Sequence, residues 1–254
     1  MDMSQNFKDQ VVLITGAGSG LGLALAFALS KQGAKLILGD VNQIALQKVV
    51  ADLLIRDIQV VFKVCDVSKN TDQMALVQLA LETWGRLDIA VNNAGICPAM
   101  KPFHEITEAD FDWSMDVNAK GVFLGMKYQL KAMLESNLLG IILNVSSVAG
   151  LGAAPKLASY SASKHAVIGL TKTAAVEYAK KNIRINAICP FYTHTPLVNE
   201  SQLSDKIEFL NNSTPMKRLA TTDEIVNVML MLCSPQNTYM TGQAIAVDGG
   251  VTAL

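Results

Sequence analysis

The chain has 254 residues, of which 50% are hydrophobic and 17% charged, so it can bury a large apolar core and has apolar residues available for subunit interfaces. Its formal net charge of −1 and its pI near 6.3 give no support for a nucleic acid or an anionic membrane surface as partner, and favour a small molecule. No linker, repeat or low-complexity tract interrupts the chain, so we expect one domain over residues 1–254.

Residues 11–29 contain no charged side chain over a length that could span a bilayer. Gly16, Gly18, Gly20 and Gly22 would weaken a spanning helix, however, and no small-residue cleavage site is evident. The four cysteines and three histidines lack metal-ligand spacing, which predicts buried free thiols and no metal site. We therefore expect a cytoplasmic protein without a membrane segment.

A short β-branched run at residues 10–14 predicts a strand that is buried on both faces of a parallel sheet. A glycine-rich turn at 15–22 follows and opens a helix at 21–32. Its glycines permit a tight turn and close backbone approach, so that helix amides can face a pyrophosphate. The expected nucleotide contacts of this turn are Gly16, Ser19, Gly20, Leu21 and Gly22.

A second strand, at 35–38, ends in Gly39 and Asp40, roughly 20 positions beyond the glycines. A carboxylate there is placed to accept hydrogen bonds from the adenosine ribose and would repel a 2′-phosphate. Neither Ser19 nor Val41 offers a cation to neutralise such a phosphate. The sequence therefore predicts NAD rather than NADP as cofactor.

Further strands and helices alternate along the chain. Strands are expected at 59–64, 87–91, 140–145, 183–189 and 243–247, and helices at 71–84, 119–136 and 222–232, the last capped by Thr222-Asp223-Glu224. Seven strands that alternate with helices predict a Rossmann-type α/β fold, a doubly wound parallel sheet with helices on both faces.

Four motifs occur in a fixed order. The turn at 15–22 has Thr-Gly-x-x-x-Gly-x-Gly spacing, Asn-Asn-Ala-Gly occupies 92–95, and Ser147 lies thirteen residues before Tyr160, which Lys164 follows four residues later. With these motifs the chain resembles the classical short-chain dehydrogenase/reductase (SDR) family, essentially from end to end. The resemblance implies cofactor contacts by Asp66, Val67, Asn93, Ala94, Gly95, Pro190, Thr193 and Thr195, and assembly as a homotetramer.

Tyr160 and Lys164 are four residues apart on a helix, so we expect the ammonium beside the phenol, where it lowers the pKa of Tyr160. In ketone reduction Ser147 would stabilise the negative charge that develops on the substrate oxygen, and Tyr160 would give it a proton. The resemblance also implies that Lys164 holds the nicotinamide ribose and that the backbone of Asn118, at a helix irregularity, holds a water near Lys164.

Phe191 departs from the family pattern, which has glycine after Pro190. Its ring could point into the substrate pocket, or outward against a lid or a neighbouring subunit. Residues 196–213 are amphipathic and are expected to form the substrate-binding lid. With Cys97, Met100 and Leu157 plausibly opposite, the pocket should be mainly apolar.

The main hypothesis is an NAD-dependent enzyme that interconverts a secondary alcohol and a ketone, with a small-molecule alcohol or ketone as its partner. A 3-hydroxyacyl thioester dehydrogenase or 3-oxoacyl reductase would use the same catalytic residues, and a cluster of Lys or Arg at the pocket mouth would favour it. A nucleotide-sensing regulator is the non-enzymatic alternative, but it could dispense with Asn118, Ser147, Tyr160 and Lys164.

Overall fold

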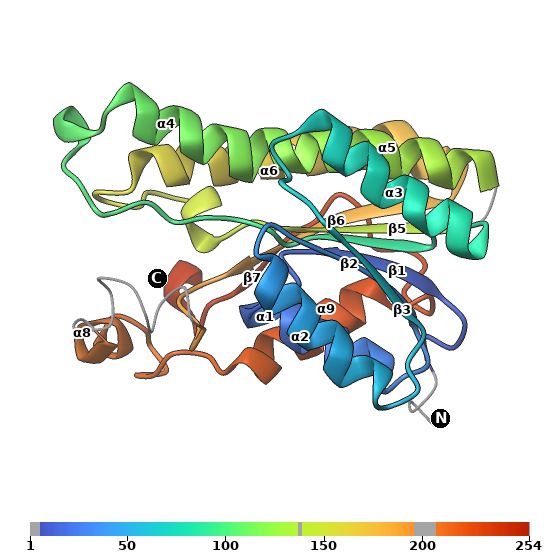
Figure 1. The fold of residues 1–254 in the computed structure, drawn as a ribbon. Coiled ribbons are helices and arrows are strands. Elements are labelled where there is room, and N and C mark those ends of the chain that lie inside the picture. The colour runs from blue at the N-terminus through green and yellow to red at the C-terminus, as the bar shows by residue number, and fades with distance from the viewer. Residues whose placement is uncertain (1–5, 137–138, 196–206, 254) are drawn as a thin grey trace.

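The computed structural model describes residues 6–136, 139–195 and 207–253. Within these ranges seven parallel strands form one sheet in the order β3-β2-β1-β4-β5-β6-β7, with helices on both faces (Figure 1). The expected doubly wound fold is therefore confirmed. The strands are β1 (Val11–Thr15), β2 (Lys35–Asp40), β3 (Val60–Val64), β4 (Ile89–Asn92), β5 (Gly140–Val145), β6 (Ile183–Pro190) and β7 (Ala244–Val247).

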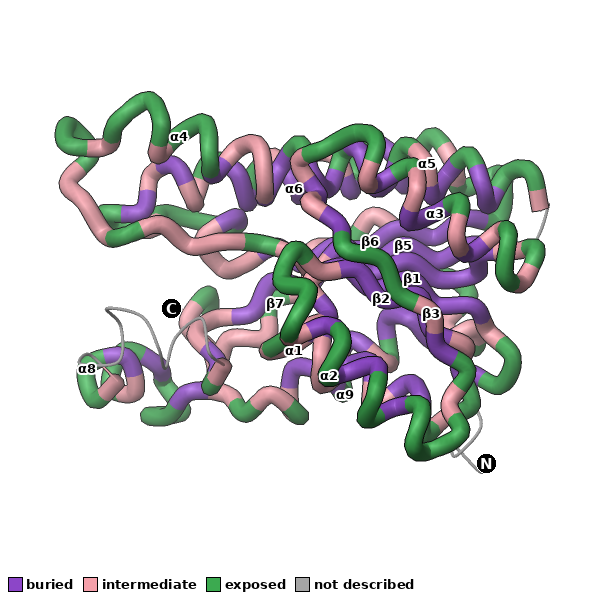
Figure 2. Tube along the Cα trace, viewed as in Figure 1, coloured by how far each residue is buried: buried purple, intermediate pink, exposed green. Residues whose placement is uncertain are grey.

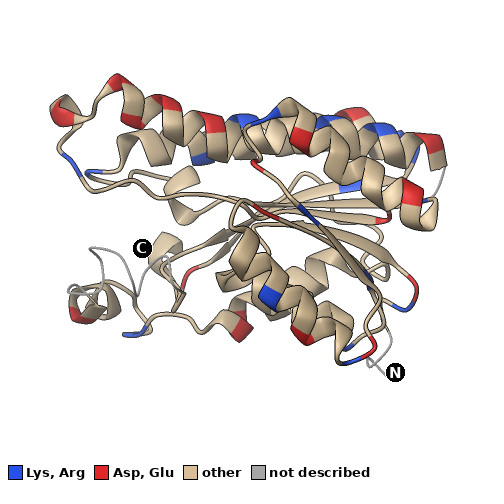
Figure 3. Cartoon of the chain, in the orientation of Figure 1, with Lys and Arg blue, Asp and Glu red and all other residues tan. Residues whose placement is uncertain are grey.

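The helices lie in two layers (Figure 1). One layer contains α1 (Gly20–Ser30), α2 (Gln43–Leu54) and α9 (Thr222–Cys233), and the other contains α3 (Asn70–Trp84), α4 (Glu108–Ser114), α5 (Gly121–Ser136) and α6 (Ala158–Tyr178). Positive and negative residues are interspersed along the layer of α3 and α5 (Figure 3). None of the helices in the described ranges is both long enough and apolar enough to cross a bilayer.

The strands are apolar on both faces because each face is covered by helices. In β1, Val12 and Ile14 belong to the core cluster beneath α1 and α9, whereas Val11 and Leu13 belong to the cluster beneath α3 and α5. Successive side chains of a strand point to opposite faces, so an uninterrupted apolar run is needed to fill both cores. The buried residues accordingly concentrate in the sheet (Figure 2).

Two helices and one helix boundary differ from the sequence-based expectations, whereas the helix irregularity expected at Asn118 is present. Helices α2 and α4 are additional to the expected elements. The helix expected from residue 119 is preceded by a π-helix at Met115–Lys120, and α5 itself begins at Gly121. A π-turn inside a helix marks a local irregularity, often at a functional site, and this one contains Asn118.

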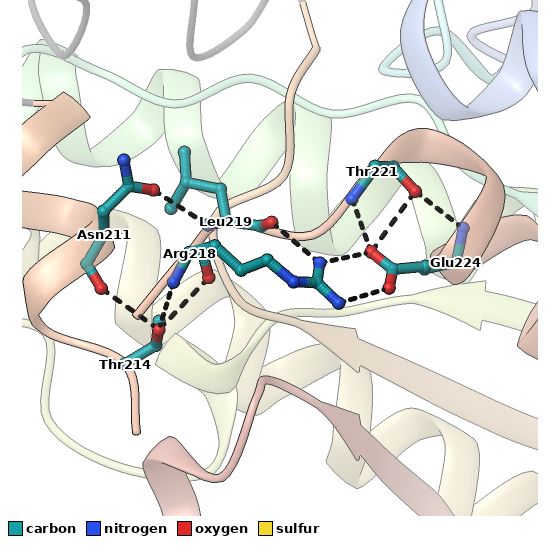
Figure 4. A network of polar contacts seen from close by, with 6 residues as sticks. All are labelled: Asn211, Thr214, Arg218, Leu219, Thr221 and Glu224. Atoms are coloured by element: carbon teal, nitrogen blue, oxygen red, sulfur yellow. Dashed lines mark hydrogen bonds and ion pairs between the residues drawn. The ribbon is translucent and has the colours of Figure 1, made fainter. Parts of the chain in front are cut away.

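Residues 196–206 of the expected lid lie outside the described residues, and the rest of it includes the short helix α8 (Ile207–Asn212). A polar network ties the chain after α8 to the start of α9 (Figure 4). Asn211 accepts the N–H of Leu219 at 2.9 Å, and the guanidinium of Arg218 donates to both carboxylate oxygens of Glu224 at 2.8 and 2.6 Å. These bonds connect the C-terminal end of α8, through the segment that follows it, to the first turn of α9.

The cap of α9 is one residue earlier than expected. Thr221, not Thr222, is the N-cap: its side chain accepts the N–H of Glu224, and the Glu224 carboxylate accepts the N–H of Thr221. This reciprocal capping box satisfies two donors that a helix otherwise leaves free. The hydroxyl of Thr222 instead donates to the carbonyl of His194.

Replacing Thr221 with Ala should lower the melting temperature by about 2–4 °C, because one side of the capping box is lost. Differential scanning calorimetry would measure the change. Thr83→Ala, at an exposed position within α3, is the matched control and should leave the melting temperature nearly unchanged. An equal shift in both variants would contradict the assignment of the cap to Thr221.

Candidate active site

A cavity of about 960 Å³ opens at the carboxyl ends of the strands. It is lined by the segments that follow β1, β2, β3, β4, β5 and β6, and by α8. From β1 the chain adds strands β2 and β3 on one side and then β4 to β7 on the other, so the strand order reverses between β1 and β4. Ligands of such sheets bind at this point of reversal. The lining is mainly apolar, with polar groups concentrated at a few positions.

The glycine-rich turn after β1 leaves no room for a side chain at Gly16 or Gly22. Gly16 has a φ of +65°, and a Cβ there would lie 2.8 Å from the Cα of Ala94. A Cβ on Gly22 would lie 2.2 Å from the carbonyl oxygen of Gly16. The backbone can therefore approach a ligand closely at the start of α1, as dinucleotide phosphates require.

Thr15 and Asn93 join the turn after β1 to the turn after β4. The Thr15 hydroxyl accepts the N–H groups of Asn93 and Ala94, both at 3.1 Å. The Asn93 amide donates to the carbonyls of Thr15 and Gly16 at 2.9 and 3.1 Å. The Asn93 side chain, an expected cofactor contact, thus serves to hold the glycine turn in place beside the cavity.

Asp40 ends β2 at the margin of the cavity, as the sequence predicts. Its carboxylate accepts the N–H groups of Gly18 and Asn42, each at 2.8 Å. These two bonds fix the carboxylate with its remaining acceptor capacity available to a ligand. Val41, the next residue, is 69% exposed and carries no charge.

Asp66 and Val67 lie after β3 and line the same part of the cavity. The hydroxyl of Ser68 donates to Asp66 at 2.7 Å and, with the Ser68 N–H, holds the pKa of that carboxyl below its ordinary value. The other oxygen of Asp66 forms an ion pair with Lys69 at 3.6 Å, so both oxygens have partners in the chain.

Asn118 is fully buried in the π-helix, and every polar atom of its side chain has a partner. It accepts the N–H of Ile96 at 2.8 Å and donates to the Ile96 carbonyl and to Ser163. Its side chain thereby couples the segment after β4 to α6, the helix that carries Tyr160 and Lys164.

Lys164 is 4% exposed, and the ammonium donates to the carbonyl of Val145 at 2.9 Å. Its Nζ lies 5.6 Å from the centre of the Tyr160 ring, so the two side chains are neighbours, as the helical spacing predicts. Burial lowers the pKa of Lys164 to about 8, because the charged ammonium is desolvated and its hydrogen bond goes to a neutral carbonyl.

The expected lowering of the Tyr160 pKa is wrong for the protein without cofactor. Burial raises the pKa of Tyr160 above its ordinary value, and the neighbouring thiol of Cys97 adds to the rise. The hydroxyl of Ser147 opposes it only in part. The phenol therefore keeps its proton at neutral pH, and desolvation is the largest cause of the raised pKa.

The segment after β6 closes the cavity from the opposite side. Pro190 ends the strand, and its carbonyl accepts a long hydrogen bond from Ser147 at 3.4 Å. A Cβ on Gly20 would lie 3.7 Å from the Cβ of Thr195, so this segment meets the start of α1. The expected cofactor residues Thr193 and Thr195 thus border the space between the glycine turn and Tyr160.

Phe191 lines the cavity, as the inward alternative predicts, and packs edge-to-face against Tyr192 with ring centres 4.7 Å apart. Tyr192 and Trp113 also line the cavity, although no role for either was expected from the sequence. Tyr192 could have been found because it directly follows Phe191, the residue that departs from the family pattern. Trp113 belongs to α4, a helix that was not expected.

The prediction of buried cysteines holds for Cys65, Cys189 and Cys233 but not for Cys97. Cys97 is partly exposed, lines the cavity and donates weakly to the carbonyl of Pro98 at 3.7 Å. Cys97 follows β4 and lies at the substrate end of the cavity, where the sequence predicted that it would help to form an apolar wall of the pocket.

A family profile described as enoyl-(acyl carrier protein) reductase matches residues 16–252. The chain is 37% identical to cyclohexanol dehydrogenase of Acinetobacter sp. (strain SE19), with 99% of this chain and 98% of that protein covered. It is 40% identical to levodione reductase of Leifsonia aquatica, with 97% and 96% covered.

Solved structures agree with these sequence matches. A crystal structure of levodione reductase superposes with a TM-score of 0.93 at 39% identity and covers 97% of this chain and 99% of that one. A 3-ketoacyl-(acyl-carrier-protein) reductase from Brucella melitensis complexed with NADH gives 0.89 at 34%, with 96% and 99% covered. ElxO with NADP bound gives 0.90 at 31%, with 97% and 100% covered.

The site geometry and these matches lead to the same family. Tyr160, Lys164 and Ser147 meet beside a glycine turn that fits a dinucleotide, and proteins that cover almost the whole chain at 37–40% identity are oxidoreductases by name. The chain therefore belongs to the classical short-chain dehydrogenase/reductase family, whose members use a nicotinamide cofactor, and it is an oxidoreductase that acts on CH–OH groups.

Proposed function

We propose that the protein is an NAD(H)-dependent enzyme that interconverts a cyclic secondary alcohol and its ketone in a mainly apolar pocket. The observation that carries the proposal is the meeting of Ser147, Tyr160 and Lys164 in one cavity that also reaches the glycine turn. Ring substrates are part of the proposal because two relatives are named for them.

The nicotinamide cofactor supplies or accepts the hydride when it is bound. Tyr160 is the proton donor of ketone reduction in this proposal, since its phenol carries a transferable proton and lines the cavity with Ser147 and Lys164. Ser147 lies beside it and stabilises charge on the substrate oxygen. Lys164 holds positive charge close to both groups, while Val145 and Asn118 fix the surrounding backbone.

NAD is the proposed nucleotide because the adenosine end of the cavity has a carboxylate and no cation. Among the described residues that line the cavity, Lys164 is the only Lys or Arg, and it lies at the opposite, catalytic end. A 2′-phosphate would meet Asp40 without a positive partner. Among the solved structures of relatives, one contains NADH and another contains NADP.

The charges near the pocket give less support to a thioester substrate carried by a protein or coenzyme. Lys101 pairs with Asp110, and Arg218 pairs with Glu224. Lys217 donates to the carbonyl of Asn212. Among the described residues that line the cavity, Lys164 is the one Lys or Arg, so the lining offers no cluster of cations to a phosphopantetheine arm. Four free cysteines suit the reducing cytoplasm, which the proposal takes as the location.

Assembly into a homotetramer is also part of the proposal. The outer faces of α5 and α6 form a groove of about 550 Å³, where Phe123 is 50% and Leu134 is 40% exposed. Lys127 and Glu177 lie on the same groove. A two-fold axis would bury the apolar residues and bring opposite charges together.

Phe123→Glu should shift the protein to smaller assemblies, because a charge would be buried in that interface. Sedimentation velocity measures the change. Leu54→Glu, on α2 at a position that is 54% exposed, is the control and should leave the assembly intact. A wild-type monomer would contradict the proposal of self-association.

Tyr160→Phe should lower kcat by about 10²–10⁴ while NADH binding stays nearly unchanged, because the ring still packs but the transferable proton is gone. Absorbance of the reduced nicotinamide, followed with cyclohexanol and cyclohexanone, measures the rate. Tyr239→Phe makes the same change at a fully exposed site and should be inert. Unchanged turnover in Tyr160→Phe would remove this residue from the mechanism.

Asp40→Asn should shift the preference from NADH towards NADPH by about tenfold, because the charge that repels a 2′-phosphate disappears. The Asn amide oxygen can still accept the N–H of Gly18, so the glycine turn keeps its support. Adding Val41→Arg should strengthen the shift. Dissociation constants for both nucleotides test this, and a wild type that already prefers NADPH would refute the assignment of NAD.

A further inference from the structure

Tyr192 stands out among the polar groups at the substrate end of the cavity. The hydroxyls of Ser213 and Thr193 donate to the carbonyls of Leu210 and Phe191. In contrast, the phenol of Tyr192 forms no hydrogen bond to any residue in ranges 6–136, 139–195 and 207–253, although the side chain lines the cavity. A hydroxyl in mainly apolar surroundings without a protein partner is available to a ligand.

The Tyr192 ring is held firmly. Phe191 packs against it edge-to-face at 73°, and Leu210 of α8, Leu219 and Met100 form the small apolar cluster that it joins. A side chain that is fixed by packing can present its hydroxyl to a ligand with little loss of conformational entropy.

Tyr192 lines the same cavity as the catalytic phenol of Tyr160. It is partly exposed and lies beside Phe191, which also lines this cavity. Tyr160 approaches from α6 and Tyr192 from the segment after β6.

The charge of this end of the cavity restricts what Tyr192 can bind. Burial raises the pKa of Tyr192, so the phenol is neutral and protonated. Lys164 is the only Lys or Arg among the described lining residues, and it is engaged behind Tyr160 with the Val145 carbonyl. A carboxylate or phosphate would find no free cation there, whereas a neutral carbonyl or hydroxyl oxygen would find a donor.

The other donors near this position are less suitable. Trp113 is 50% exposed, so its indole N–H can be satisfied by water. The Cys97 thiol is a weak donor that already contacts the Pro98 carbonyl. The group whose hydrogen-bonding capacity is most clearly unused is the Tyr192 hydroxyl.

We propose that Tyr192 determines specificity by hydrogen-bonding a second oxygen of the substrate, which is a compact, neutral ring compound with two oxygens: a diol, a hydroxyketone or a dione. One oxygen reacts at Ser147 and Tyr160, and the other binds Tyr192. This inference rests on the proposed function and narrows it to a substrate class.

The test compares two ketones of nearly equal size, 4-hydroxycyclohexanone and 4-methylcyclohexanone, with NADH and with NADPH. The wild type should show a kcat/KM for the hydroxyketone about tenfold above that for the methyl compound, since a site built for a hydroxyl disfavours an analogue that lacks it. In Tyr192→Phe this preference should fall to about one, mainly through KM, because the contact is remote from the reacting carbon.

Both ketones are measured on the same sample, so a partial loss of folded Tyr192→Phe cancels in the ratio. Tyr239→Phe makes the same change at a fully exposed site and should keep the wild-type ratio. An unchanged ratio in Tyr192→Phe, or a wild type that prefers the methyl compound, would overturn the role of Tyr192 while leaving the proposed function intact. Absence of turnover of either ketone by the wild type would count against both.

Discussion

The site depends on a buried cation that the protein does not neutralise with a carboxylate. Lys164 is 4% exposed, and the contact of its ammonium is a backbone carbonyl, that of Val145. A charge in such surroundings is unfavourable unless polar groups of the chain are held rigidly enough to compensate the lost hydration. Asn118 provides part of that rigidity, because it bonds Ile96 on one side and Ser163 of α6 on the other. A Cβ on Gly95 would lie 3.3 Å from the ammonium, so this glycine leaves the space that Lys164 needs.

The parallel sheet makes this arrangement possible by bringing distant segments to one edge. The turns after β1 and β4 are tied through Thr15 and Asn93, and the segment after β6 reaches the start of α1 at Thr195. Strand register therefore fixes the distance between the glycine turn and Tyr160. A displacement of one strand would move a nucleotide contact relative to a catalytic group. The hydrogen bonds between the turns after β1 and β4 oppose such a displacement.

Sequence spacing was enough to place the glycine turn, Asp40 and the Ser147, Tyr160 and Lys164 set, because each belongs to a short segment of fixed local geometry. It was insufficient where the outcome depends on tertiary burial. The Tyr160 pKa is raised rather than lowered, since desolvation can be judged only after α6 has packed. The α9 cap at Thr221 and the exposure of Cys97 to the cavity likewise depend on neighbours that are remote in sequence. Trp113 was missed together with its helix, α4.

Phe191 links the departure from the family pattern to the substrate end of the cavity. Its φ is not in the left-handed region, so the backbone at this position does not require the glycine that the pattern has. What a large residue adds is an aromatic surface: the ring packs edge-to-face against Tyr192, whose other neighbours belong to α8 and to the segment after β4. A glycine there would remove this aromatic contact and leave the Tyr192 ring packed against Leu210 and Leu219. The Phe191 side chain therefore supports the ring that carries the Tyr192 hydroxyl, and it also shapes the pocket. The presence of Phe191 in place of glycine and the unpaired phenol of Tyr192 thus belong to the same part of the cavity wall.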